Sequence, residues 1–226
     1  MLRASFFEVI HMKQNTKKLV LLAMLSAMAF MMVALIRVPV VLFLKYEPKD
    51  VIITIGGFLL GPMASFITSL VVSLIEMVTI SETGPIGAIM NLLSTCAFSC
   101  TAAFIYKKHH TLKGAIMGLI TGSIATIATM LLWNYLITPL YMTGTSRSDI
   151  ATMLVPVFLP FNALKAGFNS ALTLGLYKPV VTALRKARLV EDRPSNGSGS
   201  KIGIYLLSAA LLITCVLLLL VMRGII

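Results

Sequence analysis

Long apolar runs separated by short polar loops constrain the fold of this chain more than any other feature. A helix needs about 20 mostly apolar residues to cross the hydrocarbon core of a bilayer, and apolar runs near that length recur through most of the 226 residues. With 58% hydrophobic and 12% charged residues, the composition is far from that of a soluble domain. We therefore predict an all-α integral membrane protein, with spans at residues 18–36, 50–60, 63–80, 86–106, 112–137, 157–181 and 202–222.

These segments divide into two parts. Residues 17–188 are predicted to form a compact six-transmembrane-helix bundle, and residues 202–226 an additional C-terminal transmembrane helix. Between them, residues 189–201 contain EDRPSNGSGS, whose proline, glycine, serine and charge content is typical of a flexible linker. The last segment is leucine-rich and has no internal charge. We expect it to be a lipid-facing anchor.

The second predicted span, residues 50–60, is unusually short. It contains the pair Gly56 and Gly57 and is followed by Gly61 and Pro62. This pattern indicates either a broken helix or a span whose outer end is the polar cluster before it. Interrupted helices within the membrane are tolerated where they line a cavity, so a broken helix here would indicate a ligand site. The alternative is an ordinary turn, which would have the same residues.

Basic residues gather at the loops of one side in an alternating topology. The net charge is +11, and these residues precede the first span, join the fourth to the fifth, and follow the sixth: Lys13, Lys17, Lys18, Lys107, Lys108, Lys113, Lys178, Arg185, Lys186, Arg188, Arg193 and Lys201. The positive-inside rule makes that side cytoplasmic. We expect a multi-pass protein of the cell membrane whose residues 1–16 are a cytoplasmic segment. Topology and an anionic inner leaflet explain the charge, so we predict no nucleic-acid partner.

Two polar clusters lie on the predicted outer side. Residues 41–50 read VLFLKYEPKD, which is either an ordinary solvated loop or a helix cap at the membrane face. Asn162 and Lys165 open the sixth span, and their spacing of three residues puts them on one helix face. An amide and an ammonium on one face present several donors to a carbonyl-rich ligand. The alternative is a lysine that extends to the outer surface above an incidental asparagine.

Other polar residues inside the spans allow two interpretations each. Asn134 follows Trp133, which is either a stacking surface for a ligand or a member of the interfacial aromatic belt. Glu76 is expected to pair with Lys165 or with a ligand hydroxyl, or else to reach the headgroups. Asn91 is expected to make a hydrogen bond between helices.

The sequence gives no support for catalysis. It contains no G-x-x-x-x-G-K-[ST] loop, no H-E-x-x-H and no G-x-S-x-G. Cys96, Cys100 and Cys215 all lie in apolar stretches and are interpreted as small buried hydrophobes rather than metal ligands. We therefore predict neither an enzyme nor a metal site.

Three motifs together make the chain, over about residues 13–188, similar to the riboflavin-specific substrate-binding (S) component of energy-coupling factor (ECF) transporters. They are FLKYEPKD after the first span, the Gly57–Pro62 stretch, and FNALK at the start of the sixth span. The resemblance implies a riboflavin pocket near the outer face, roofed by the loop after the first span, with riboflavin as transported ligand and no cofactor. It assigns flavin contacts by position: Leu44, Lys45 and Glu47 from the covering loop, with Asn134, Asn162 and Lys165 from the helices.

The resemblance also implies partners. Small residues spaced four apart let another helix approach closely, and Ala23 and Ala27 in the first span have this spacing. Internal packing explains the pattern as readily as a partner does. By resemblance, these alanines dock on the transmembrane coupling subunit, and two ATPase subunits supply energy. The alternatives are an S component for another vitamin, or a small membrane enzyme without a flavin site.

Overall fold

The computed structural model describes residues 2–42, 44–81, 83–141, 144, 146–186 and 201–225, with side chains left undescribed for residues 2–15, 185, 201 and 202. Its elements in chain order are α1 (Leu2–Leu35), β1 (Val38–Val41), β2 (Leu44–Tyr46), α2 (Lys49–Leu60), α3 (Pro62–Thr79), α4 (Gly84–Thr95), η1 (Cys96–Cys100), α5 (Thr101–Lys108), α6 (Leu112–Leu136), α7 (Thr138–Tyr141), α8 (Arg147–Met153), η2 (Leu154–Phe158), α9 (Leu159–Lys186) and α10 (Lys201–Met222). The predicted linker, apart from its last residue, lies outside the described residues.

Six helical stretches in the described part of the chain are long and apolar enough to cross a membrane. They are Thr16–Leu35, Pro62–Thr79, Gly84–Lys108, Leu112–Leu136, Arg147–Leu184 and Gly203–Met222. The prediction of an all-α membrane protein with a C-terminal span is confirmed. The predicted division into a cytoplasmic segment, bundle, linker and anchor stays a prediction.

The second predicted span, residues 50–60, is instead a short buried helix. With 12 residues, α2 is about 18 Å long, well below the hydrocarbon thickness of about 30 Å. It ends where Gly61 adopts a positive φ of 97°, and Pro62 then occupies the first turn of α3. Ten consecutive residues, from Lys49 to Phe58, are buried. The first turn of α2, which carries charged residues, therefore lies inside the protein.

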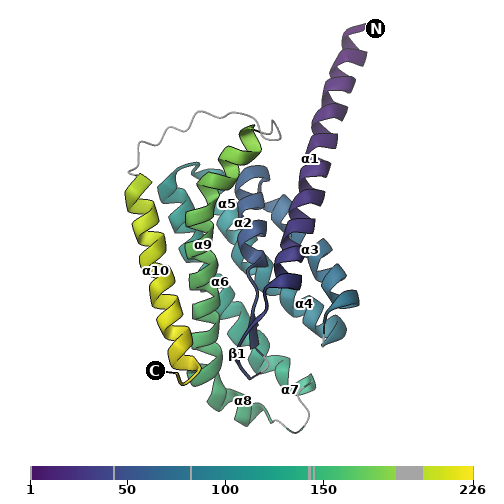
Figure 1. Ribbon diagram of the computed structural model, residues 1–226. Coiled ribbons are helices and arrows are strands. Elements are labelled where there is room, and N and C mark those ends of the chain that lie inside the picture. The colour runs from purple at the N-terminus through teal and green to yellow at the C-terminus, as the bar shows by residue number, and fades with distance from the viewer. Residues whose placement is uncertain are drawn as a thin grey trace.

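An antiparallel hairpin connects α1 to α2. Strand β1 pairs with β2, with Val38 opposite Tyr46 and Pro39 opposite Lys45. In Figure 1 the hairpin extends toward the end of the bundle that carries α7 and α8, and the chain then turns back into α2. The hairpin packs there with Ile150, Phe158 and Phe161 in one apolar cluster. This packing closes one end of the bundle.

Two π-helical turns interrupt the long helices. The first, η1, continues α4 into α5, and the second, η2, joins α8 to α9. Pro156 lies within η2 and has no N–H to donate to the helix ladder. Such bulges are frequent near functional sites, and η1 brings Ser99 to within 2.8 Å of the Thr54 hydroxyl on α2.

Glycines on α6 allow unusually close helix contact. A Cβ atom at Gly118 would come within 2.7 Å of the Ala102 carbonyl oxygen, and one at Gly122 within 2.6 Å of the Phe98 carbonyl oxygen. The small residues at these two positions therefore serve packing within the protein. They bring α6 against η1 and α5, which places the α4 and α6 residues of the candidate site near one another.

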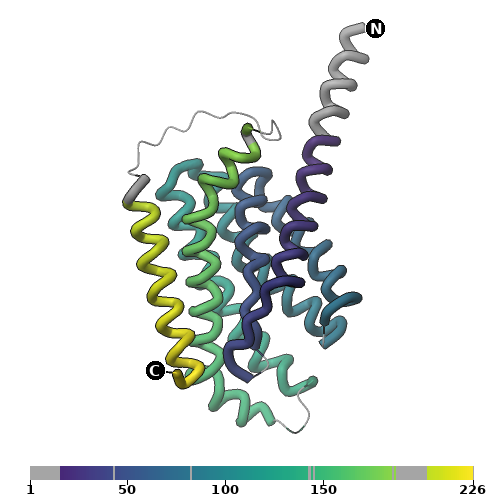
Figure 2. Tube along the Cα trace, viewed as in Figure 1, coloured from purple at the N-terminus to yellow at the C-terminus, as the bar shows by residue number. Residues whose placement is uncertain are grey.

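The C-terminal helix is part of the bundle on one side. Figure 2 shows α10 running beside α9, and the Ser208 hydroxyl donates to the Ala171 carbonyl at 2.7 Å. At the far end of α10, Arg223 Nε donates to the Pro39 carbonyl of the hairpin at 3.2 Å. Leucines on the opposite face, such as Leu206, are exposed. A purely lipid-facing anchor was expected, but one side of α10 is in contact with protein.

Candidate functional site

A cavity lies between the hairpin and the beginning of α9. Its wall combines residues of β2, α4, α6 and α9, and we call it the hairpin cavity. Its apolar lining includes Ile86, Met90, Met130 and Phe161. Polar and charged side chains, among them Lys45, Glu47 and Asn134, make up much of the rest of the wall. Such a mixture is typical of small-molecule sites, in which a few polar groups orient a largely buried ligand.

All six predicted ligand contacts line this one cavity. They are Leu44, Lys45, Glu47, Asn134, Asn162 and Lys165. They come from three separate parts of the sequence, and the fold brings them together. Trp133 is not among the described residues that line the cavity, so its interpretation as a stacking surface is not supported. Aromatic side chains that do line it are Phe161 and Tyr141.

Two asparagine amides are held in fixed directions along their helices. Asn162 Nδ2 donates to the Phe158 carbonyl at 2.7 Å, and Asn134 Nδ2 donates to the Met130 carbonyl at the same distance. Thr138 donates to Asn134 Oδ1 at 3.0 Å. Each NH₂ group has a second hydrogen, which these bonds leave for a molecule in the cavity.

Lys165 points inward rather than to the surface. The residue is 8% exposed, and its Nζ donates to Ser94 Oγ at 3.1 Å. The same nitrogen lies 3.5 Å from Asp50 Oδ2. The alternative of a lysine that extends to the outer surface is therefore wrong, and the predicted shared inward face with Asn162 is confirmed.

Glu76 pairs with a different lysine from the one expected. Lys49 Nζ lies 2.7 and 2.6 Å from the two Glu76 carboxylate oxygens, and Asn91 Nδ2 donates to the same carboxylate at 2.8 Å. Glu76 is 1% exposed, so it does not reach the headgroups. The predicted pair with Lys165 is wrong because Lys165 contacts Asp50 instead. The predicted interhelical hydrogen bond of Asn91 is confirmed.

The Lys49–Glu76 pair continues toward the hairpin through Glu47. Lys49 Nζ lies 3.2 Å from Glu47 Oε2, and Arg37 Nε donates to Glu47 Oε1 at 2.9 Å. Arg37 also donates to the Ile80 carbonyl at the end of α3. Charges taken out of water must be paired to be tolerated, so these contacts fix β2 against α1, α2 and α3.

The hairpin also contacts α9 through Tyr46. Its ring centroid lies 5.1 Å from that of Phe168, and its hydroxyl donates to Asn169 Oδ1 at 3.1 Å. Burial raises the pKa of Tyr46, and the negative charge of Asp50 adds to the shift. The phenol therefore stays protonated at neutral pH and remains a donor.

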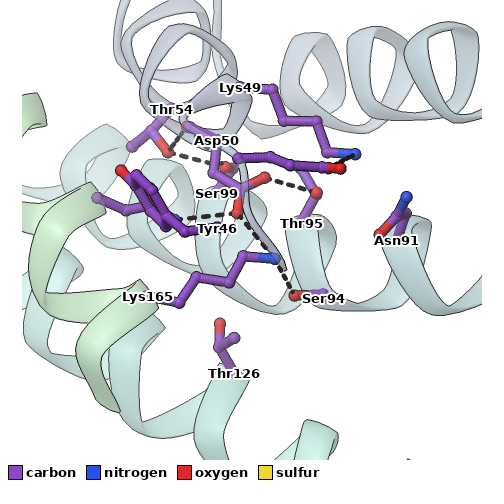
Figure 3. Close-up of polar contacts among 12 residues, drawn as sticks. Tyr46, Lys49, Asp50, Thr54, Asn91, Ser94, Thr95, Ser99, Thr126 and Lys165 are labelled. Atoms are coloured by element: carbon purple, nitrogen blue, oxygen red, sulfur yellow. Dashed lines mark hydrogen bonds and ion pairs between the residues drawn. The ribbon is translucent and has the colours of Figure 1, made fainter. Parts of the chain in front are cut away.

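Sequence reasoning missed the buried roles of Lys49, Asp50 and Asn169. The first two were interpreted as part of an outward-facing polar loop, yet they are 1% and 0% exposed. The available signal was the short second segment. A helix too short to cross the membrane can begin inside the protein, so its first residues are buried there. Figure 3 shows Lys49 and Asp50 of α2 beside Thr95 of α4, with Lys165 of α9 nearby.

The predicted docking residues lie on the outside of α1. Ala23 and Ala27 are exposed, whereas Leu25, Ser26 and Ala29 are turned into the bundle. Internal packing therefore does not account for the two alanines. Their exposure leaves a small-residue face available to another helix, and docking itself stays a prediction.

The match to known proteins covers most of the chain. The family model described as ECF transporter, substrate-specific component, matches residues 17–177. The riboflavin transporter RibU of Staphylococcus aureus is 31% identical over 185 residues, which is 78% of this chain and 96% of that protein. The riboflavin transporter FmnP of Bacillus subtilis is 30% identical over 162 residues, covering 67% of this chain and 85% of that protein.

A solved structure of the S component of a bacterial ECF transporter has the same fold. It superposes on this chain with a TM-score of 0.64 at 29% identity. The match covers 76% of this chain and 99% of that chain. Helix α10 lies beyond the residues that the family model matches. The family model, the relatives and the shared fold together establish that this chain belongs to the substrate-specific components of ECF transporters, which are transport proteins rather than enzymes.

Proposed function

We propose that this S component captures riboflavin at the outer face of the cell membrane and delivers it inward with an ECF coupling subunit and two ATPase subunits. The observation that carries the proposal is the convergence of the six residues Leu44, Lys45, Glu47, Asn134, Asn162 and Lys165 on one cavity. The riboflavin transporters at about 30% identity support the choice of vitamin.

The cavity chemistry suits riboflavin. The flavin ring is flat and largely apolar, and Met90, Met130 and Phe161 offer an apolar wall with polarizable sulfur atoms. The pyrimidine edge of the ring has carbonyl groups, for which the Asn162 amide and the Lys165 ammonium are donors. A ligand that leaves these donors unpaired loses affinity, which gives the site its selectivity.

The charge distribution supports an outward-facing cavity. In Figure 1 the turn between α5 and α6 lies at one end, whereas the hairpin, α7 and α8 lie at the other. Lys107, Lys108 and Lys113 flank that turn. By the positive-inside rule the lysine-rich end is cytoplasmic, so the hairpin end faces outward.

Fluorescence titration tests the vitamin assignment. The purified protein in detergent is mixed with riboflavin, and we expect saturable quenching of the flavin emission at micromolar ligand or below. Adding thiamine or a pterin as a competitor should leave the quenching of the riboflavin emission unchanged. Unquenched flavin emission, or displacement by another vitamin, would assign a different ligand to this S component.

A further inference from the structure

The Lys165 side chain is held by two groups that are not predicted ligand contacts. Its Nζ donates to Ser94 Oγ at 3.1 Å and lies 3.5 Å from Asp50 Oδ2. The Ser94 contact is a hydrogen bond and the Asp50 contact an ion pair. An ammonium has three N–H groups, and Lys165 also lines the hairpin cavity. The direction in which Lys165 presents its charge therefore depends on Asp50 and Ser94.

The Asp50 carboxylate is itself fixed on both oxygens. Thr95 Oγ1 donates to Oδ1 at 2.7 Å, and Asn169 Nδ2 donates to Oδ2 at 3.0 Å. The residue is 0% exposed and lies in the first turn of α2, where the helix dipole favours a negative charge. Figure 3 shows Asp50 at the centre of this group, with Lys165 below it. A carboxylate on α2 that is held by side chains from α4 and α9 has a fixed position relative to the ammonium.

The same group is connected to the hairpin that covers the cavity. Asn169 bonds Asp50 through its nitrogen and accepts from Tyr46 of β2 through its oxygen at 3.1 Å. A single amide therefore joins the hairpin to the carboxylate that faces Lys165. The position of the hairpin and the direction of the ammonium are thus set by one connected group of side chains.

We propose that Asp50 is a positioning residue for the ligand site. It touches no ligand and acts by holding the Lys165 ammonium toward the hairpin cavity. This inference rests on the proposed binding of riboflavin in that cavity. It predicts that removing the Asp50 charge weakens riboflavin binding only while Lys165 is present.

A double-mutant cycle tests the proposal. Riboflavin affinity is measured by fluorescence titration for the unmodified protein, Asp50→Asn, Lys165→Met and the double variant. We expect Asp50→Asn to weaken binding about tenfold in the unmodified background, and about twofold or less in the Lys165→Met background. Equal fold losses in both backgrounds would mean that Asp50 acts on the whole bundle, and would overturn the proposal.

Glu76→Gln is the matched control because it neutralises another buried carboxylate, one that contacts Lys49 rather than Lys165. Its effect on affinity should be the same with and without Lys165.

Should Asp50→Asn fail to fold, Thr95→Val loosens the carboxylate without removing its charge. We expect Thr95→Val to weaken binding about threefold, again only when Lys165 is present. Loss of affinity in Thr95→Val that persists in the Lys165→Met background would equally overturn the proposal. Absence of quenching by the unmodified protein would instead reject the riboflavin function itself.

Discussion

At the scale of single residues, the hairpin cavity depends on polar groups that are buried but paired. Asn162 is 2% exposed, and its amide donates a hydrogen bond to the Phe158 carbonyl at the end of η2. The same side chain lines the hairpin cavity, where most of its surface is shielded from water. In such surroundings a ligand that pairs with it gains affinity, and its removal costs a hydrogen bond in the bound state.

Replacing Asn162 by alanine should weaken riboflavin binding by about 1–3 kcal/mol, the range for leaving a buried partner unpaired. Flavin titration of the purified variant measures the change. Thr121→Val is a matched control because that hydroxyl is exposed and donates to the Met117 carbonyl of its own helix. Wild-type affinity in Asn162→Ala would remove this residue from the site.

The Lys49–Glu76 pair should matter for stability rather than for specificity. Lys49→Met leaves two buried carboxylates, Glu76 and Glu47, without their ammonium, and breaking a buried pair in this way costs about 3–5 kcal/mol. We expect a lower thermal unfolding temperature for the ligand-free protein in detergent. Adding Glu76→Gln to Lys49→Met should restore part of the loss. If Lys49→Met unfolds at the same temperature as the unmodified protein, the pair contributes no stability.

At the scale of elements, α10 belongs to the bundle as well as to the lipid. Gly167 of α9 faces Cys215 of α10, and a Cβ atom there would lie 2.6 Å from the sulfur. The residues Leu219 and Met222 pack against the apolar cluster of the hairpin. The helix thus covers α9 along its length and reaches the hairpin at its end.

Gly167→Leu should push α10 away from α9 and increase hydrogen exchange in the backbone amides of residues 203–222. The added side chain has no room beside Cys215, and overpacking of this kind displaces neighbouring elements. Exchange followed by mass spectrometry on the ligand-free protein measures the change. Gly203→Leu is the control, since a Cβ atom at that position meets nothing within 4 Å. Equal exchange in both variants would indicate that α10 is an independent anchor.

At the scale of the whole molecule, the bundle presents different surfaces for ligand and for partner. The hairpin cavity lies at one end, between β2 and the helices α4, α6 and α9. Ala23 and Ala27 lie on the outer face of α1. Because these regions are separate, substitutions on the α1 face should affect transport without affecting capture.

Ala23→Trp and Ala27→Trp should leave riboflavin affinity unchanged and abolish uptake, because bulky side chains prevent the close approach of a second helix. Affinity is measured on the isolated protein, and uptake in cells that contain the coupling subunit and ATPases. Ile124→Trp serves as the control, since Ile124 is also an exposed apolar residue but lies on α6. Retained uptake in both alanine variants would exclude docking through this face.

Local hydropathy was sufficient for the class of the protein and for most of its helices. The apolar segments are long enough to cross a bilayer as helices, and a helix satisfies its backbone hydrogen bonds within itself, as lipid surroundings require. The spacing of Asn162 and Lys165 was also sufficient to place them on one face, since helical periodicity is a local property. The sequence by itself therefore determined the fold class and, through its motifs, the family.

Only the tertiary structure decided which buried groups meet. Asn169 contacts Asp50 across 119 positions in the sequence, and Glu76 selects Lys49 rather than Lys165. The burial of α2 and the contact of α10 with the hairpin also depend on residues that are far apart in the sequence. Pairing of buried charges depends on which helix ends lie side by side, and the helix periodicity of one segment contains no information about its neighbours.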